Sequence, residues 1–393
     1  MQPRNEIINF DDLAIAFSSK TDHQLKKANL IFTLINNKWL SIIFTAIVKF
    51  ALKIRMPVKG IIRQTVFAHF CGGESIDDST RTVEELKKYG IGTILDYSVE
   101  GEKTSAGFDK AMKEIIRTID AARDHDGIPF SVFKMTGMAS VTLLEKISSG
   151  AMLMADEHEA FERIKYRVNC VCDHAAQAGV PIMIDAEETW VQGPIDKITY
   201  EMMARYNKEK TIVFNTYQMY RTDSLKNLKE GIAEARRSGY YFGTKLVRGA
   251  YMEKERERAA EEGRPSPIHA DKNATDQCFD DGLRLCFENK DIVSVMCGSH
   301  NEVSNKLLAG LIMDNGIERN DQRMWFSQLY GMSDNISFNL ARSGFNIAKY
   351  VPYGPILAVM PYLFRRAEEN TSVAGQSSRE LQMIRKEIRR RKI

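Results

Sequence analysis

The sequence has little of the features that define several specialised classes of protein. Its 393 residues include only six cysteines, and the formal net charge is +3. Such a weak positive charge, with no RNA-binding or zinc-finger motif, argues against a nucleic-acid partner. The cysteine spacing fits neither a zinc site nor a dense disulfide framework, so it predicts reduced thiols in a reducing compartment. The cysteines are Cys71, Cys170, Cys172, Cys278, Cys286 and Cys297.

Long apolar runs are also missing. The most apolar stretch, Trp39–Val48, is only about ten residues long, which is too short to cross a bilayer and predicts a core or interfacial helix. Residues Met1–Ile7 have no signal-peptide pattern, and the early acids Glu6 and Asp11 are unlike a transit peptide. We therefore expect a cytoplasmic protein.

The composition, with 44% hydrophobic and 27% charged residues, is that of an ordinary globular chain. The length allows one large domain with an extension, or two domains. Residues 1–85 have helical apolar periodicity, which is clearest in Leu25–Ile35 and Leu40–Val66. After them, short β-branched or aromatic runs alternate with amphipathic helical stretches, and this alternation predicts βα units.

Eight runs are strand candidates, and eight βα units in roughly 270 residues match the size of a (βα)8 barrel better than that of a doubly wound sheet. The runs are Gly92–Ser98, Phe130–Thr136, Pro181–Ala186, Thr211–Gln218, Phe242–Tyr251, Ile292–Ser299, Met324–Tyr330 and Ile347–Tyr353. The clearest helical stretches between them are Phe108–Arg123, Phe161–Ala178, Leu225–Arg237 and Asn273–Glu288.

Polar or charged side chains stand at the end of nearly every strand candidate, and they support the barrel more strongly than the count of runs. They are Asp96, Lys134, Asp185, Glu187, Gln218, Arg248, Tyr251, His300, Asn301, Gln328 and Tyr350. In barrel enzymes the C-terminal strand ends form the active-site mouth. A single polar residue at one strand end is usually a loop residue, but eight successive ends predict a site.

The last predicted helix has a polar stripe, because Tyr362, Arg365, Arg366 and Glu369 follow the i, i+3, i+4, i+7 spacing of one face. Two adjacent guanidiniums beside a tyrosine suit a carboxylate. The simpler interpretation is a solvated helix face with an Arg365–Glu369 pair.

The excess of cations at the strand ends and in this stripe suits an anionic ligand, such as a phosphate-bearing cofactor together with a small carboxylate. A metal cage is disfavoured, because His300 is the only histidine at a strand end. Lys134 has two interpretations: a Schiff-base lysine of an aldolase-type lyase, or an ion pair with Asp185. We favour the ion pair.

Eight short motifs, in order along the chain, give a specific resemblance to the proline dehydrogenase family. They are Phe133–Thr136, Ile184–Glu188, Tyr217–Gln218, Arg248–Arg256, Gly298–Asn301, Gln328–Met332, Tyr350–Pro352 and Tyr362–Asn370. The resemblance runs from about residue 85 to 375. It implies a distorted (βα)8 barrel that holds FAD, with the last helix over the barrel mouth. The corresponding division is an N-terminal helical extension (1–85), the catalytic barrel (86–375) and a basic helical tail (376–393).

The resemblance also implies residue roles. Arg365 and Arg366 would clamp the proline carboxylate, Tyr350 and Tyr362 would shape the pocket over the ring, and Lys134 with Asp185 would line its floor. Tyr251 would complete the pocket from the flavin side. The residues expected to hold the cofactor are Gln218, Lys245, Arg248, Gly249, Ala250, His300, Asn301, Gln328 and Leu329. A carboxylate clamp at one end of a small ring would hold its reacting carbon near flavin N5.

The implied activity is oxidation of L-proline to Δ1-pyrroline-5-carboxylate by hydride transfer to flavin N5, the first step of proline catabolism. No aldehyde dehydrogenase segment follows the barrel, so we expect a monofunctional enzyme and a separate pyrroline-5-carboxylate dehydrogenase. Alternatives are a hydroxyproline dehydrogenase on the same fold, a Lys134 lyase without flavin, and a silent binding protein. The strand-end polar groups and the arginine pair argue against the last.

Basic residues gather in the 38–63 region and in Arg385–Lys392. Such runs are usually solvated helix faces. Here a quinone acceptor for the flavin's electrons would give them a second use, because they would hold the enzyme on the inner face of the anionic cytoplasmic membrane.

Overall fold

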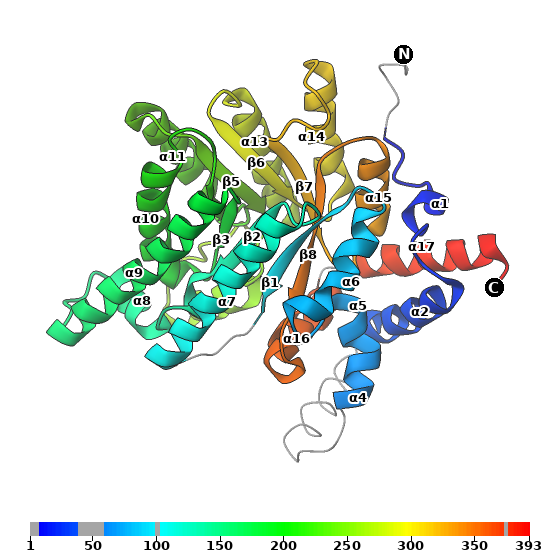
Figure 1. Cartoon of the computed structure of the whole chain (residues 1–393), viewed down its shortest axis with the longest axis horizontal. Coiled ribbons are helices and arrows are strands. Elements are labelled where there is room, and N and C mark those ends of the chain that lie inside the picture. The colour runs from blue at the N-terminus through cyan, green and yellow to red at the C-terminus, as the bar shows by residue number, and fades with distance from the viewer. Residues whose placement is uncertain (1–7, 38–58, 99–102, 373–375) are drawn as a thin grey trace.

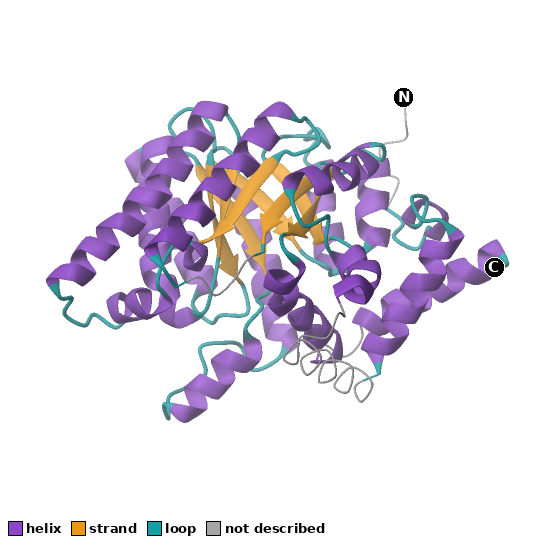
Figure 2. Cartoon of the chain, turned by 60° about the horizontal axis from the view of Figure 1, so that its bottom comes forward, coloured by secondary structure: helices purple, strands orange, loops and turns teal. Residues whose placement is uncertain are grey.

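The computed structural model describes residues 8–37, 59–98, 103–372 and 376–393, with the side chains of 367–378 excepted. Eight parallel strands close into a barrel in which each strand pairs with the next and β1 pairs with β8. Figure 2 shows the strands inside a surrounding layer of helices. The strands are β1 (Gly92–Tyr97), β2 (Phe130–Lys134), β3 (Ile182–Asp185), β4 (Val213–Gln218), β5 (Phe242–Val247), β6 (Val293–Gly298), β7 (Met324–Leu329) and β8 (Ile347–Tyr353). The predicted (βα)8 barrel is therefore confirmed, and every predicted run contains one strand.

Helices follow each strand and cover the barrel. They are α7 (Ser105–Asp124), α8 (Val141–Ser148), α9 (Ala155–Ala178), α10 (Thr189–Tyr206), α11 (Ser224–Ser238), α12 (Met252–Glu261), α13 (Lys272–Glu288), α14 (Glu302–Asp314), α15 (Asp334–Arg342) and α16 (Ile356–Ser372), with a 3-10 turn, η2 (Met135–Gly137), after β2. Local sequence fixes their ends: Thr104 accepts from the Gly107 amide at the start of α7, and Gly179 ends α9 at φ 69°.

Two apolar layers hold the barrel. Side chains alternate across each strand, so Ile94, Phe130 and Met296 fill the interior while Leu95, Phe133 and neighbouring residues pack against the helices. Burial of this outer layer is the main stabilising contribution, at roughly 25 cal/mol per Å² of apolar surface.

A second core lies beside the barrel and joins the two ends of the chain. The N-terminal elements are α1 (Leu13–Ala16), α2 (Asp22–Asn36), α4 (Lys59–Ile62), a π-helix η1 (Arg63–Phe67), α5 (Ala68–Phe70) and α6 (Ile76–Lys87). Apolar residues of α2 and α5, such as Leu25, Phe32 and Phe70, pack with α16 and with the terminal helix α17 (Gln376–Arg391). Figure 1 shows α2 and α17 side by side. The division at residues 85 and 375 stays a prediction.

The N-terminal segment also reaches the end of β8. The Gly72 amide donates to Pro352 O at 2.9 Å, and the Gly354 amide donates to Gly73 O at 3.1 Å. A Cβ on Gly72 would lie 2.6 Å from the Val351 side chain, so the close approach requires glycine. This contact fixes the turn from which α16 starts.

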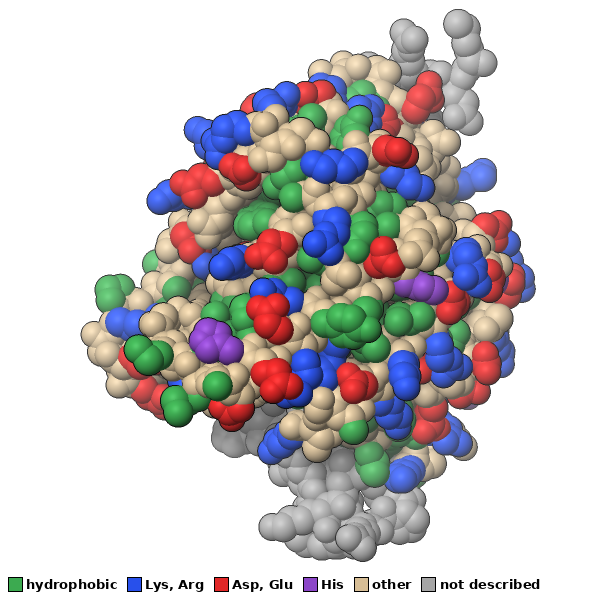
Figure 3. All heavy atoms as spheres, turned by 60° about the vertical axis from the view of Figure 1, so that its left-hand side comes forward, with side chains coloured by type: hydrophobic (Ala, Val, Ile, Leu, Met, Phe, Trp, Pro, Cys, Tyr) green, Lys and Arg blue, Asp and Glu red, His purple; other side chains and the backbone are tan. Residues whose placement is uncertain are grey.

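All six cysteines are unpaired thiols. The Trp39–Val48 stretch lies outside the described residues. Within the described part of the chain, no helix is both long enough and apolar enough to cross a membrane. On the face that carries α8 to α11, Lys and Arg side chains are interspersed with Asp and Glu (Figure 3).

Candidate active site

The carboxyl ends of the strands bring several predicted residues together inside the barrel. Lys134 and Asp185 are neighbours in the register of β2 and β3. Lys134 Nζ donates to Asp185 Oδ2 at 3.0 Å, which is the predicted ion pair. Lys245 Nζ donates to the other oxygen, Oδ1, of the same carboxylate and to Tyr350 Oη at 2.6 Å. One carboxylate thus serves two buried lysines.

The protonation of this cluster follows from burial and charge. Burial alone would raise the pKa of Asp185, but the charges of Lys134 and Lys245 outweigh it and lower that pKa to about 2. Burial would lower the pKa of Lys134, but Asp185 and other neighbours raise it well above the ordinary value. The pKa of Lys245 is lowered, because burial outweighs the attraction of Asp185. Two ammonium groups around one carboxylate leave the trio with a net positive charge.

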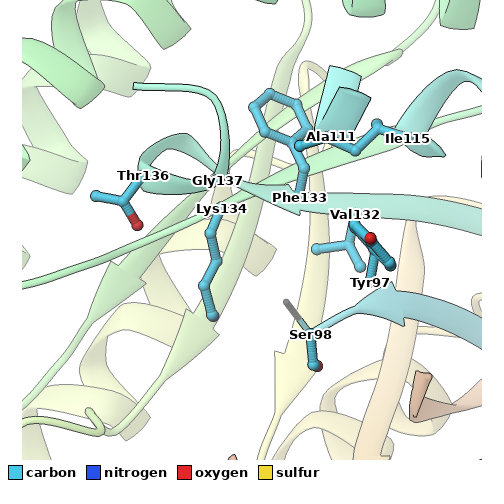
Figure 4. Close-up of a pocket in the computed structure, with 9 residues that line it drawn as sticks. All are labelled: Tyr97, Ser98, Ala111, Ile115, Val132, Phe133, Lys134, Thr136 and Gly137. Atoms are coloured by element: carbon cyan, nitrogen blue, oxygen red, sulfur yellow. The ribbon is translucent and has the colours of Figure 1, made fainter. Parts of the chain in front are cut away.

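Strand alternation decides which side chains reach the interior. Figure 4 shows Phe133 pointing toward Ala111 and Ile115 of α7, whereas Lys134 points the other way. A small pocket at the ends of β1 and β2 is lined by both residues, together with Tyr97, Ser98 and Thr136. The pocket therefore borders the Lys134–Asp185 pair.

A band of hydrogen bonds links four successive strand ends. Glu187 accepts from the Thr136 amide at 2.9 Å and from the Thr136 hydroxyl. Its own carbonyl accepts from Gln218 Nε2 at 2.7 Å, and Gln218 Oε1 accepts from the Ala250 amide at 3.1 Å. Gln218, only 3% exposed, is thus fixed by backbone groups on both sides. Burial raises the pKa of Glu187 to about 7.

Gly249 lets the chain turn tightly next to this band. Its φ is 138°, and a Cβ there would lie 2.5 Å from the Tyr220 ring. Glycine alone adopts this conformation without cost. The predicted cofactor residues Gly249 and Ala250 therefore position backbone rather than side chains.

Arg248 braces the loop after β6. Its guanidinium donates to Asp276 at 2.7 Å, to Ser299 Oγ at 2.6 Å and to Ser304 Oγ at 2.9 Å. Asn301 caps α14 by accepting from the Val303 amide at 2.8 Å. Both residues fix the position of His300, which lies between Ser299 and Asn301 in the sequence.

The His300 ring is partly buried. Its Nδ1 lies 2.9 Å from Ser333 Oγ. Burial and the charge of Lys349 lower the pKa of His300 to about 3, so the ring is neutral at physiological pH.

Gln328 lies elsewhere than the predicted mouth. Its side chain points between β7 and the outer helices, where it donates to Ser299 O at 2.9 Å and accepts from Ser337 Oγ at 2.8 Å. Adjacent strand residues face opposite sides, and the next one, Leu329, packs against the interior cluster. Gln328 thus links the loop after β6 to α15.

Helix α16 carries Arg365 and Arg366, whose charges reach residues at the strand ends. Arg366 is buried, with its guanidinium 5.0 Å from the centre of the Tyr362 ring. The Arg365 charge acts on the Tyr251 phenol, and the Arg366 charge acts on His300. The two arginines thus act on different halves of the mouth. The Glu369 side chain lies outside the described residues.

Sequence reasoning missed a second buried charge cluster. Lys349, on β8, is fully buried, and its Nζ lies 2.9 Å from Asp334, which also faces Lys20 at 3.4 Å. Glu380 of α17 is buried next to this cluster. A lysine inside the apolar run Ile347–Tyr353 was a usable signal, because a buried cation requires a partner. Its partners could not be identified from the pattern.

These observations define a class: an α/β-barrel enzyme whose strand ends form a buried, cationic site near a helix that carries two arginines. The sequence profile of the proline dehydrogenase family matches residues 79–379. The chain belongs to the proline dehydrogenase family and is an enzyme of that family. The resemblance stated from the motifs is confirmed.

Comparisons with individual proteins agree with this family assignment. The chain is 32% identical to mitochondrial proline dehydrogenase 1 of Arabidopsis thaliana over 86% of this chain and 77% of the relative. It is 34% identical to the carbapenem antibiotics biosynthesis protein CarD of Pectobacterium carotovorum, covering 85% of this chain and 86% of that protein. The solved structure of proline utilization A from Bdellovibrio bacteriovorus superposes with a TM-score of 0.71 at 21% identity, over 92% of this chain. The chain spans 38% of that longer protein, so this match concerns the fold.

The residues present fit the flavin that this family membership implies. A flavin offers ring carbonyls and nitrogens as acceptors, and its phosphates are anionic. The mouth supplies donors of matching kind in Lys134, Lys245 and the α16 arginines. The Thr216 hydroxyl, next to Lys245 in the strand register, is buried and has no hydrogen-bond partner among the described residues. A ligand above it could supply that partner.

Proposed function

We propose that the chain oxidises L-proline to Δ1-pyrroline-5-carboxylate with bound FAD. The single observation that carries the proposal is the Lys134–Asp185–Lys245–Tyr350 cluster at the strand ends, beneath the arginines of α16, in a member of the proline dehydrogenase family. The reaction removes a hydride from the ring carbon next to nitrogen and a proton from the nitrogen. Bound FAD supplies the acceptor for the hydride.

The protein's own residues orient the substrate. Arg365 and Arg366 approach the mouth from α16 and bind the proline carboxylate, since guanidinium groups match carboxylate geometry. Tyr362 lies under the Arg366 guanidinium and holds it by a cation–π contact. The carboxylate is attached to the carbon on one side of the ring nitrogen. Anchoring it fixes the position of the carbon on the other side, from which the hydride leaves.

The strand-end cluster acts on the substrate's proton. A cationic surrounding disfavours a protonated amine, and only the neutral amine can release the hydride. Lys134 is protonated at neutral pH and Asp185 cannot neutralise both lysines. Tyr350, held by Lys245, and Tyr251, near Lys134, close the sides of the pocket.

The cofactor residues are proposed to act in two ways. Lys245 and His300 offer polar atoms at the mouth. Gln218, Arg248, Asn301 and Gln328 fix loops through the hydrogen bonds described above, while Gly249, Ala250 and Leu329 supply backbone and apolar surface.

A visible absorption spectrum of the purified protein, recorded before and after anaerobic L-proline, tests the proposal. Flavin bands that bleach with proline are expected. Bands that bleach with hydroxyproline but persist with proline would select the rival substrate. Failure to take up added FAD would contradict the proposal, and trapping of a substrate on Lys134 by borohydride would favour the lyase.

We further propose that a quinone receives the electrons and that basic residues bring the enzyme to a membrane. Arg391 is held by Asp22 and by Phe17 O, so only part of the C-terminal basic run faces outward. The exposed Lys386 and Arg389 are the candidates. Sedimentation with anionic vesicles at low salt should carry the protein down, and K386A/R389A should reduce binding. Equal sedimentation with neutral vesicles would refute an electrostatic contact.

A further inference from the structure

The loop from β7 to α15, residues 330–333, is held by side chains from distant parts of the chain. His69 Nε2 lies 3.0 Å from Gly331 O, and Lys349 Nζ donates to Met332 O. The Ser333 amide donates to Glu380 Oε2 at 3.1 Å. The contacts come from the N-terminal segment, from β8 and from α17, so three parts of the chain determine the loop.

Ser333 has an unusual backbone at this point. Its φ of 51° lies in the left-handed region, and among the described residues only one other non-glycine residue, Lys392, has a positive φ. Such a conformation costs energy and persists only where the surroundings fix it. The buried Glu380 carboxylate, which receives the Ser333 amide, is the group placed to do so.

The same serine reaches the candidate cofactor site. Its hydroxyl lies 2.9 Å from His300 Nδ1, and the Leu329 amide lies 3.5 Å from Nε2 of the same ring. The beginning of α17 also contacts the start of α14, because Arg379 pairs with Glu302 at 2.6 Å, one residue after Asn301. Thus α17 contacts the loop that follows Leu329 and the first residue of α14, which follows Asn301.

Glu380 lies one residue beyond the segment matched by the family profile, residues 79–379, and Lys20 and His69 lie before it. The buried cluster that they form with Asp334 and Lys349 is nevertheless continuous with the barrel. Both end segments therefore pack against the barrel on the side where His300 lies.

We propose that Glu380 is a positioning residue for the cofactor: it holds Ser333 in its left-handed conformation and thereby fixes the His300 ring at the mouth. The inference rests on the proposed function for its cofactor, but the Glu380–Ser333–His300 link itself does not. Glu380 touches neither substrate nor reacting atoms in this scheme. It acts through the loop.

Flavin affinity of three variants tests the link. E380A removes the acceptor for the Ser333 amide and should raise the Kd of the apoprotein for FAD about tenfold or more. E380Q keeps an acceptor oxygen and should stay within about threefold of wild type. Q382A changes an exposed residue on the same helix and should leave the Kd unchanged. The KM for L-proline should hardly move in any of them, because α16 carries the carboxylate-binding arginines.

A double-mutant cycle separates positioning from general stability. S333A removes the hydroxyl that faces His300 but keeps the amide that faces Glu380. If the two residues act in series, E380A/S333A should bind FAD about as weakly as the weaker single variant. Independent, additive losses would overturn the proposal.

Hydrogen exchange of the apoprotein provides a readout that needs no flavin. In E380A, amides in residues 299–304 and 329–335 should exchange faster, whereas those of β3 and β4 should not change. Unchanged exchange in these loops together with wild-type FAD affinity would overturn the positioning role. A wild-type protein that takes up no FAD would instead overturn the proposed function, and the exchange data would then decide on the link alone.

Discussion

Two buried lysines that share one carboxylate are the main electrostatic feature at the residue scale. Lys134 and Lys245 both contact Asp185, and Lys245 also donates to Tyr350. Burying three charges costs free energy that their mutual attraction only partly offsets. This cluster lies at the strand ends, beside a helix with two arginines.

The arginine pair gives the first prediction. Arg366→Met and Arg365→Met should each raise the KM for L-proline, because losing a charge-assisted contact with a carboxylate costs about 1.5–3 kcal/mol, or roughly tenfold to a hundredfold. Steady-state kinetics with the flavin content measured in parallel checks this. Arg284→Met, at an exposed position of α13, is the control. A variant of either residue with normal KM and full flavin would contradict its assignment.

Asp185→Asn should unfold more easily, because the amide removes the carboxylate that contacts both buried lysines. Removing one partner of a buried pair costs about 3 kcal/mol or more. Urea denaturation at pH 7 measures the change. Glu209→Gln, an exposed carboxylate, should change the free energy of unfolding by less than about 0.5 kcal/mol. Equal stability of the two variants would mean that the lysines are not both charged.

At the scale of elements, strand ends and turns decide which groups meet. The turn after β5 is an example, since Gly249 approaches the Tyr220 ring and the next amide, Ala250, donates to Gln218. The sequence motif marks this stretch, but the reason for its glycine appears only when the neighbouring strand is in place.

Gly249→Ala should destabilise the protein by about 1–3 kcal/mol, because its φ of 138° and the Tyr220 ring at 2.5 Å leave no room for a Cβ. It should also weaken FAD retention by moving Ala250. Gly310→Ala is the matched control: this glycine lies in α14 with open space around its Cβ direction, so alanine should stabilise by about 0.5–1 kcal/mol. Thermal melts and flavin content check both. A stable, fully flavinylated G249A would refute the argument.

At the scale of elements, the sequence predicted the positions of the strands but not always which side each residue faces. All eight strand candidates contain a strand, because hydrophobic alternation and turn residues are local signals. The side a residue faces was harder to read: Gln328 was placed in the mouth but points outward, since a shift of one residue along a strand reverses the side chain. Lys349 was overlooked because attention went to its neighbour Tyr350. Tyr350 faces the interior, so Lys349 faces the opposite side of the strand.

At the scale of the whole molecule, a buried charge network connects the ends of the chain to the barrel. Asp334 is the centre of this network, with Lys349 at 2.9 Å and Lys20 at 3.4 Å. Burial would raise the pKa of Asp334, but the two lysines outweigh it and lower that pKa to about 2. Asp185 has the same balance and a pKa of about 2.

Acid stability follows from these two carboxyls. An aspartate whose folded pKa lies below its unfolded value adds stability above the unfolded pKa of 3.8, and this stability is lost as the pH falls through the folded value near 2. A shift from 3.8 to about 2 corresponds to about 2 kcal/mol per residue. The free energy of unfolding should therefore fall steeply between pH 4 and pH 2.

Asp334→Asn should lower the free energy of unfolding at pH 7. It should also reduce the loss of this free energy between pH 4 and pH 2 by about 2 kcal/mol, because the carboxyl with the lowered pKa is gone. Denaturant titrations at several pH values measure both effects. An acid limb as steep as that of wild type would show that Asp334 does not titrate with a lowered pKa.

The sequence by itself determined the order of the βα units, the chemistry at each strand end and the family. These features are local: a run of β-branched residues, a polar residue at its end, a short motif. Tertiary structure alone decided which groups meet. Lys245 reaches Asp185 across 60 residues, and Ser333 meets Glu380 across 47. Closure of the barrel and docking of α17 bring these side chains within bonding distance, and no local pattern encodes a contact whose geometry depends on every element between its partners.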